Sequence, residues 1–375
     1  MLWGMLYGLV GWERTIAELL SDRGYSTGMF GKWHLGVSPG RYPTDQGFDE
    51  WYGIPNTSDE SEYTTQFQYD PKVGTHPVIM QARKGETPQT VEDYDLPARR
   101  EIDAELVKRS IDFMERSVKA DKPFFAFVPL TQPHLPTLPH LDFDGKTGEG
   151  PYADVLAEID HRTGQLLEAV DRLKIRDNTL FIFTSDNGPE RTETWYGSAG
   201  PWRGEYFTIL EGSLRVPLIM RWPGKVEAGR VSNEMVHMVD MLPTLARVGG
   251  AEVPADRKID GVDALDFFTG KQAKSNREGF PAFNGEELYG YKWRNWKMHL
   301  WELNDMYDIP KKLNVPRLYH LIQDPKEQFD IVAKNTWVLP VVTKRIVRFN
   351  KSLVEEPPIR LGTPEPYSPV KPAGQ

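Results

Sequence analysis

The sequence predicts an α/β protein built on a doubly wound, mostly parallel β-sheet. Between residues 12 and 248, short apolar runs of strand length alternate with longer amphipathic stretches of helical period. An apolar run without polar alternation is typical of a strand buried on both faces, so the runs indicate a sheet that helices cover on both sides. The strand candidates are Tyr25–Phe30, Phe124–Leu130, Leu180–Phe183 and Leu214–Trp222.

The helices are predicted from apolar residues that recur every three or four positions. They are Trp12–Arg23, Arg99–Ala120, Tyr152–Leu173 and Met235–Val248, the last with a kink at Pro243. Residues Asn56–Pro97 are polar and lack a clear period. We expect them to form a long irregular loop at the rim of a functional site.

The composition changes near residue 270, which predicts three regions. Residues 1–270 should form the α/β core. Residues 271–354 contain an aromatic-rich, partly alternating stretch and a later amphipathic one, so we expect a small C-terminal α+β subdomain with an antiparallel sheet and a helix. Residues 355–375 are Pro-rich, and we expect no regular structure there.

Composition excludes several classes of function. The chain has 375 residues, of which 39% are hydrophobic and 26% charged, as in globular proteins. A net charge of -9 argues against a nucleic-acid partner. The chain contains no cysteine, which excludes disulfides, thiolate metal sites and a cysteine nucleophile within it. No apolar segment reaches the roughly 20 residues of a membrane helix, so we expect no membrane partner. The sequence does not indicate an oligomeric state.

The first residues, MLWGMLYGLVG, are apolar but lack the basic region and the cleavage site of a signal peptide. The sequence therefore assigns no cellular compartment. We expect Met1 to lie inside a larger fold, so that the sequence is a fragment whose parent has a further N-terminal segment.

Polar side chains follow three of the predicted strands, at the point where each ends. Lys32 and His34 follow the first strand, His134 the second, and Asp186 and Asn187 the third. Ligands bind beyond the carboxyl ends of strands in open α/β sheets, so we expect these side chains to meet at one edge. A carboxylate and an amide oxygen suit Ca²⁺ or Mg²⁺. Taken singly, each residue also has a structural explanation: a solvated lysine, a hydrogen-bonded histidine or an Asx turn.

Five segments together resemble the sulfatase family, the formylglycine-dependent, arylsulfatase-like sulfuric ester hydrolases of the alkaline-phosphatase-like fold. In chain order they are GYSTGMFGKWHLG (24–36), TQPH (131–134), TSDNG (184–188), EGSLRVPLIMRWPG (211–224) and LYHLIQDPKEQFD (318–330). The resemblance covers about residues 12 to 335. It implies the same fold and a sulfate ester as substrate, either a small molecule or a glycan. Members of the family often work in the periplasm or outside the cell.

The resemblance also implies a role for each polar residue. Lys32 looks like the lysine that contacts the sulfate and the oxygen of the nucleophile. His34 looks like the histidine that handles the proton of the formylglycine hydrate, and His134 like the one near the leaving-group oxygen. Asp186 and Asn187 look like two of the Ca²⁺ ligands. These types suit the reaction, because cations stabilise charge on sulfate oxygens and a histidine can donate a proton to the departing oxygen.

The sequence departs from the family pattern at three places. The family's nucleophile lies in a C/S-x-P-x-R stretch, whose Cys or Ser becomes formylglycine, and no such stretch occurs here. The family's N-terminal strand carries adjacent acidic residues that complete the metal site, and this sequence has no Asp-Asp pair. We expect both in a segment before Met1, since both precede the G-K-W-H segment in the family. Finally, the family lysine five residues before the Glu of the E-G-G-x-R stretch falls on Tyr206. Arg203 is the nearest cation, and it either contacts the substrate or braces the loop.

We therefore expect a sulfatase-family chain that is inactive as given, because its nucleophile lies elsewhere. Two alternatives stay open. The same scaffold could hydrolyse phosphonate or phosphate monoesters, since the logic of metal and nucleophile is shared. The chain could also be a non-catalytic remnant that binds a ligand or a partner.

Overall fold

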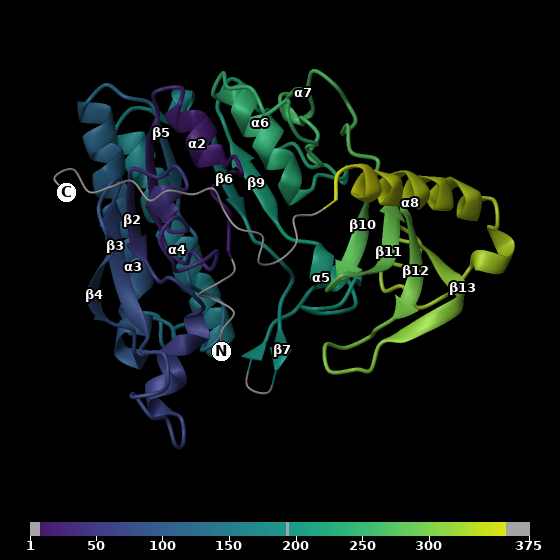
Figure 1. The fold of residues 1–375 in the computed structure, drawn as a ribbon, viewed down its shortest axis with the longest axis horizontal. Helices are drawn as coiled ribbons and strands as arrows, with labels where there is room; N and C mark the ends of the chain where they lie inside the picture. Colours follow the sequence, from purple (N-terminus) through teal and green to yellow (C-terminus); the bar gives the residue numbers. More distant parts are fainter. Residues whose placement is uncertain (1–7, 193–194, 358–375) are drawn as a thin grey trace. The chain divides into compact units, whose positions relative to one another are not determined.

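The computed structural model describes residues 8–192 and 195–357 (Figure 1). The described chain is an α/β protein, which confirms the predicted class, and its packing divides it into two compact units. The first unit holds the described residues up to Arg176 together with Leu245–Pro254. The second holds Asp177–Thr244 and the described residues from Ala255 onward. This division follows the packing, whereas the predicted boundary at residue 270 followed composition and stays a prediction.

The first unit is built on a five-stranded mixed sheet. Strand β1 lies between β2 and β5 and pairs in parallel with both. The pairs β2–β3 and β3–β4 are antiparallel. In sheet order the strands are β4 (Gln89–Asp93), β3 (Val78–Arg83), β2 (Glu50–Gly53), β1 (Ser26–Phe30) and β5 (Phe124–Phe127). The parallel part therefore contains the two strands that precede Lys32 and His134.

Both faces of this sheet are covered by packed side chains. Successive side chains of β1 point to opposite faces, and each face has its own cluster. Phe30 packs in a cluster with Ile102 and Phe113, whereas Met29 packs in another cluster with Ala17. Helix α3 (Leu96–Lys119) contacts β1, β2 and β5, and α4 (Pro151–Arg172) packs on α3 (Figure 1). The short helix α2 (Ile16–Ser21) begins at a capping box formed by Thr15 and Glu18, which satisfies its first amide groups.

The segment Asn56–Pro97 is not the irregular loop that we expected. It contains a 3₁₀ helix, η2 (Ser58–Thr65), and the strands β3 and β4, which extend the sheet. The prediction was wrong because β4 is an edge strand whose five residues are all exposed, so it has no apolar alternation to recognise. In β3 the alternation is interrupted where the register with β4 shifts after Ile79.

In the second unit, β6 (Phe181–Thr184) pairs antiparallel with β9 (Leu218–Arg221). Among the described strands these two form a sheet of their own, whereas the prediction placed β6 in the same sheet as β1 and β5. The short strands β7 (Arg191–Thr192) and β8 (Trp195–Tyr196) form another antiparallel pair. The strand predicted from Leu214 starts later, because the chain first forms the helical turn α5 (Glu211–Leu214).

Helix α6 (Met241–Val248) starts six residues later than predicted and needs no kink. Pro243 lies in its first turn, where backbone amides have no acceptor within the helix, so a proline costs no hydrogen bond. A further helical turn, α7 (Leu265–Phe268), follows. Among the described residues, no helix combines the length and the apolarity that crossing a bilayer requires.

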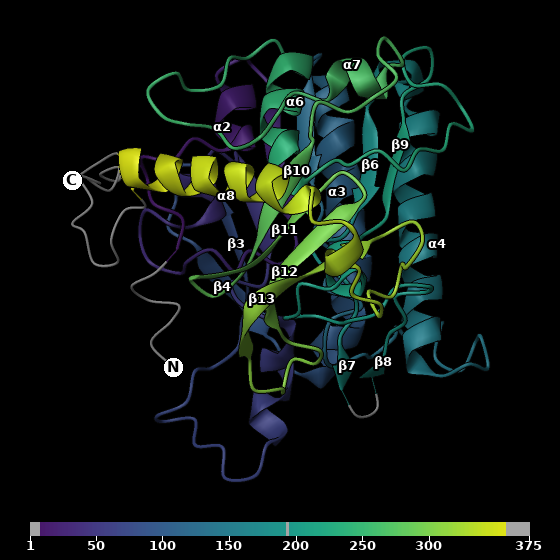
Figure 2. The same ribbon diagram turned by 90° about the vertical axis from the view of Figure 1, so that its right-hand side faces the viewer.

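The predicted C-terminal antiparallel sheet and helix are confirmed. The sheet has four strands in chain order, β10 (Gly279–Asn284), β11 (Glu287–Trp293), β12 (Trp296–Glu302) and β13 (Lys311–His320). Helix α8 (Val338–Glu355) lies across one face of it (Figure 2). Val338 and Val342 are fully buried there against Met298 and Leu318. The predicted Pro-rich tail lies outside the described residues from position 358 onward.

Candidate active site

Lys32 and His34 lie on the segment that follows β1. This segment runs beside the one after β2, with His34 N donating to Pro55 O at 2.9 Å. Gly31 is required at the strand end, because its φ is 145° and a Cβ would lie 1.9 Å from Pro129 O. His34 itself has a left-handed φ of 57°. The backbone at His34 is therefore not extended, although Lys32 and His34 are only two residues apart.

His134 lies on the turn after β5. Two buried charged residues of α3, Arg99 and Asp103, hydrogen-bond to this turn. Asp103 accepts from the backbone of Thr131 at 2.8 Å and of Gln132 at 3.1 Å. Arg99 donates to Gln132 Oε1 at 2.9 Å and to the carbonyl oxygen of His134 at 2.8 Å. Arg99 is 1% exposed and Asp103 2%. Buried charge-assisted hydrogen bonds of this kind are strong, so the turn is fixed in place.

The imidazole of His134 has a partner at each nitrogen. Nδ1 lies 2.9 Å from Leu135 O, which as a carbonyl can only accept, so Nδ1 carries a proton. Nε2 lies 3.4 Å from Thr57 Oγ1, and the Thr57 hydroxyl also hydrogen-bonds the carboxylate of Asp59. Nε2 is therefore the ring nitrogen that can exchange a proton with a ligand.

Electrostatics ties the same residues into one cluster. Desolvation and then the ammonium of Lys32 lower the pKa of both His34 and His134, and Asp59 acts on both in the opposite direction. Beside Asp59, burial raises the pKa of Glu60 to about 7, and the negative charge of Asp59 adds to the rise. The structure thus brings Lys32, His34 and His134 together, in a setting that favours neutral histidines next to a cation.

Asp186 and Asn187 form a tight turn after β6, in the second unit. Asp186 Oδ1 accepts from Asn187 N, and Asn187 Nδ2 donates to Gly188 O, each at 2.9 Å. Gly188 N donates to Ser213 O at 2.7 Å, and a Cβ on Gly188 would lie 1.8 Å from Gly212 O. The turn is therefore packed against α5.

The turn fits a hard cation in the type of its ligands but not in their number. Asp186 Oδ2 and Asn187 Oδ1 are suitable oxygens, whereas Ca²⁺ takes about 6–8. Across the part of the chain that the structure describes, no group of three or more histidine, aspartate or glutamate side chains could hold a metal ion. The pair fits Ca²⁺ or Mg²⁺ as one part of a site that needs further ligands.

Arg203 is anchored in the second unit. It donates through one guanidinium nitrogen to Glu327 O at 2.7 Å, and Gly212 N donates to Arg203 O at 2.8 Å. This loop rests on a buried charge cluster. Lys297 Nζ lies 3.1 Å from Glu211 Oε1 and 3.2 Å from the carboxylate of Glu327. Lys292 Nζ lies 2.6 Å from Glu211 Oε2. The structure thus supplies a bracing role for Arg203, and a contact with the substrate stays a prediction.

Sequence reasoning missed several residues around His134. Thr57, Asp59 and Glu60 fell within the stretch that we treated only as a rim, and Arg99 and Asp103 were treated only as helix residues. One signal was available: Arg99 and Asp103 occupy positions i and i+4 on the face of α3 that also carries Ile102 and Leu106. Lys32, His34 and His134 belong to the first unit, and Asp186, Asn187 and Arg203 to the second. That the two sets meet at one edge stays a prediction.

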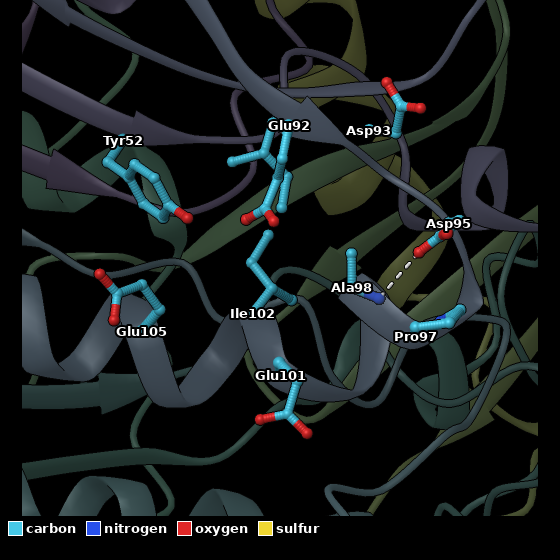
Figure 3. Close-up of a pocket in the computed structure, with 10 residues that line it drawn as sticks. Tyr52, Glu92, Asp93, Asp95, Pro97, Ala98, Glu101, Ile102 and Glu105 are labelled. Atoms are coloured by element: carbon cyan, nitrogen blue, oxygen red, sulfur yellow. Dashed lines mark hydrogen bonds between the residues drawn. The ribbon is translucent and has the colours of Figure 1, made fainter.

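A pocket of about 430 Å³ lies elsewhere in the first unit, between β4 and the start of α3 (Figure 3). Tyr52 and Ile79 contribute apolar surface, and five carboxylates surround them. These acidic residues are Glu92, Asp93, Asp95, Glu101 and Glu105. Asp95 also caps α3 by accepting from Ala98 N at 3.0 Å. No predicted site residue lines this pocket, and its negative charge does not suit a sulfate.

The fold and the cluster of a lysine and two histidines at parallel strand ends define an α/β protein suited to an anionic ester. Residues 8–251 match the family model described as Sulfatase, and residues 205–351 match the one described as N-sulphoglucosamine sulphohydrolase, C-terminal. The chain therefore belongs to the sulfatase family and is by family a sulfuric ester hydrolase.

Individual relatives agree. The chain is 31% identical to N-acetylgalactosamine-6-sulfatase from Canis lupus familiaris, covering 94% of this chain and 71% of the relative. It is 30% identical to arylsulfatase A from Homo sapiens, covering 89% and 70%. Among solved structures, the PsFucS1 sulfatase from Pseudoalteromonas sp. matches with a TM-score of 0.86 and 27% identity, over 93% of this chain and 75% of that one. Ps i-CgsB matches in fold, with a TM-score of 0.74 at 23% identity, over 93% and 76%.

Proposed function

We propose that this chain carries the sulfate-binding and proton-transferring groups of a sulfatase, and that turnover also needs a divalent cation and a formylglycine nucleophile. The observation that carries the proposal is the cluster of Lys32, His34 and His134 on the segments that follow β1 and β5. The 375 residues contain no cysteine and no C/S-x-P-x-R stretch, so the nucleophile is expected outside them and the chain as given is expected to be inactive.

Lys32 would hold the sulfate, since its ammonium is a compact charge that an anionic oxygen attracts. Desolvation and Lys32 lower the pKa of His34 and of His134, which favours their neutral forms. A bound sulfate would reverse this, because a negative charge beside an imidazole favours its protonated form. His134 would then carry a proton on Nε2 and could donate it to the leaving oxygen. The formylglycine, when present, supplies the group that attacks sulfur.

Asp186 and Asn187 would hold Ca²⁺ or Mg²⁺ together with ligands from outside these residues. The cation would supply positive charge next to the sulfate oxygens. Their oxygens follow a strand end and are fixed by the turn at Gly188, which supports this assignment. Arg203 would add a second cation, if the loop that Glu327 anchors also faces the substrate.

A sulfated glycan is the proposed substrate class. The relative from Canis lupus familiaris is an N-acetylgalactosamine-6-sulfatase, and the matching structure of Ps i-CgsB is a complex with k-i-k-neocarrahexaose. Both names concern carbohydrates. Small aryl sulfates would serve as assay substrates.

The test compares two products of the same gene, expressed with a formylglycine-generating enzyme. One is the 375-residue chain, and the other also includes any reading frame upstream of Met1. Each is assayed on an aryl sulfate, an aryl phosphate and an aryl phosphonate, with and without Ca²⁺. We expect no turnover by the short chain, because loss of a nucleophile typically removes about 10⁶-fold in rate, and sulfate hydrolysis by the longer one. Metal-dependent turnover by the short chain that His134→Ala abolishes would overturn the proposal.

A further inference from the structure

The hydroxyl of Thr57 connects His134 to the carboxylate of Asp59. Thr57 Oγ1 lies 3.4 Å from His134 Nε2 and donates to Asp59 Oδ1. Thr57 immediately precedes η2 and Asp59 lies within it, on the segment between β2 and β3. His134 is fixed from the opposite side by Arg99, which binds its carbonyl oxygen, and by its own Nδ1 contact with Leu135 O.

The hydrogen bonds among Asp59, Thr57 and His134 can be arranged in two ways. A threonine hydroxyl has one hydrogen and can donate it to only one partner. When His134 is protonated, Nε2–H donates to Thr57 Oγ1, and the hydroxyl donates to Asp59. When His134 has lost the Nε2 proton, the hydroxyl can turn its hydrogen to the bare nitrogen, and Asp59 gives up that hydrogen bond. The first arrangement places every hydrogen on an acceptor and leaves the charge of Asp59 bonded.

We propose that Asp59, acting through the hydroxyl of Thr57, is a positioning residue that stabilises the proton on Nε2 of His134. The chain Asp59–Thr57–His134 offsets the cations that face the same imidazole. The contact of Nδ1 with Leu135 O holds the other ring proton, so Nε2 stays the atom from which a proton leaves. The functional meaning rests on the proposed role of His134 as proton donor, but the effect on its protonation does not.

Most groups around His134 disfavour its protonated form, which the negative charge of Asp59 favours. Lys32 and Arg99 both disfavour a protonated His134, and His134 disfavours a protonated His34. These groups come from the segment after β1 and from α3. Desolvation acts in the same direction. Asp59 is the carboxylate that opposes them, and it acts on His34 as well. Its buried neighbour Glu60 also faces these charges, since Asp59 raises the pKa of Glu60 and Lys32 lowers it.

The experiment is an NMR titration of the imidazoles in the 375-residue chain labelled with ¹⁵N-histidine. The chain has eight histidines, and His134→Gln identifies the His134 signals. The variants are Asp59→Asn, Thr57→Val and Thr57→Ser, with Glu62→Gln as the matched control, since it removes another carboxylate of η2. Ring nitrogen shifts report both the protonation midpoint and which nitrogen carries the hydrogen.

Asp59→Asn and Thr57→Val should each lower the proton affinity of His134 about tenfold, the size expected for losing a hydrogen bond to a charged group. Thr57→Ser, which restores the hydroxyl, should match the unaltered chain, as should Glu62→Gln. Only Asp59→Asn should also shift His34.

A different pattern would overturn the proposal. If Asp59→Asn lowers both midpoints while Thr57→Val changes neither, Asp59 acts through space by its charge and the hydroxyl chain has no role. If Asp59→Asn does not fold, the comparison of Thr57→Val with Thr57→Ser still tests whether the hydroxyl of residue 57 stabilises the proton on His134. Because no substrate, metal or nucleophile enters the titration, its outcome is separate from whether the protein hydrolyses sulfate esters.

Discussion

Replacing Lys297 by methionine should destabilise the second unit more than any surface change. Lys297 is 0% exposed and lies between the carboxylates of Glu211 and Glu327, 3.1 Å and 3.2 Å away. Lys297→Met keeps much of the side-chain volume but removes the shared cation. Burial alone would raise the pKa of Glu211, and Lys297 and then Lys292 reverse this and hold it below its ordinary range. The variant therefore leaves buried negative charge without its main partner.

The size of the loss follows from what stays behind. Breaking a buried ion pair by removing one partner costs about 3–5 kcal/mol. Glu211 keeps Lys292 at 2.6 Å and Arg215 at 2.6 Å. Glu327 keeps no full positive charge within its cluster, only the ring of His299 at 2.7 Å and the backbone amide of Glu211, which donates to its carboxylate at 2.7 Å. Most of the loss therefore falls on Glu327, and we expect about 3 kcal/mol at pH 7, at the lower end of that range.

The loss should depend on pH in a definite direction. With Lys297 in place, the lowered pKa of Glu211 and of Glu327 gives stability that is present above the ordinary value of 4.5 and disappears as the pH falls through the lowered pKa. Without Lys297, burial dominates and raises the pKa of Glu327 above 4.5. Its native form then takes up a proton more readily than its unfolded form. The deficit is full above the raised pKa and shrinks as the pH falls toward 4.5.

Amide hydrogen exchange along β11 and β12 is the measurement, because it reports on the unit that holds the cluster. Urea denaturation at pH 7 and pH 5 gives the same quantity for the whole chain. Lys326→Met, an exposed lysine beside Glu327, is the matched control and should change stability by no more than about 0.5 kcal/mol. A loss below about 1 kcal/mol, or an equal loss at pH 7 and pH 5, would refute the reasoning.

Three further predictions concern the site. A crystal structure should place His134 within about 15 Å of Asp186, since groups that act on one small ester lie a few hydrogen-bond lengths apart; a larger separation would show that the two sets of residues serve different sites. Calorimetry should find Ca²⁺ binding by the 375-residue chain weaker than about micromolar, the range of sensor sites, and Asp186→Ala should abolish what binding there is. In the protein that includes the nucleophile, Arg203→Ala should lower turnover by roughly 10²–10³-fold if Arg203 contacts the sulfate, whereas unchanged kinetics with lowered thermal stability would assign it to the contact with Glu327.

The sequence was informative where one local pattern determines both structure and chemistry. An apolar run followed by polar residues predicts a strand end. β1 does end just before Lys32, and β5 ends at Phe127, ahead of the turn that carries His134. The five motifs then identified the family, because they occur together and in the family's order along the chain. Such patterns do not contain pairing partners. β6 was expected in the same sheet as β1 and β5, whereas among the described strands its hydrogen bonds go to β9.

The residues that sequence reasoning missed are charged or hydroxyl side chains held in the interior. A lysine or a glutamate is almost always exposed, so Lys297 and Glu327 carry no sign that they are buried. Thr57 lies in a stretch that has neither a hydrophobic period nor a motif. Only its distance from Nε2 of His134 indicates a role for it. These positions are determined by partners far away in the chain, 77 residues for Thr57 and His134. One sequence read alone does not reveal such pairs.

Each set of site residues rests on its own buried charges. In the first unit, Arg99 and Asp103 bind the backbone that carries His134. In the second, Glu211 and Glu327 bind Lys297 under the loop that carries Arg203. Burying charge is costly, and an apolar core of the same volume would often be more stable. What charged partners add is direction, because a hydrogen bond fixes a backbone group where an apolar contact lets it slide. A proton donor must hold its nitrogen within a fraction of an ångström of the reacting oxygen, so directional contacts under each turn are the kind of support that such chemistry needs.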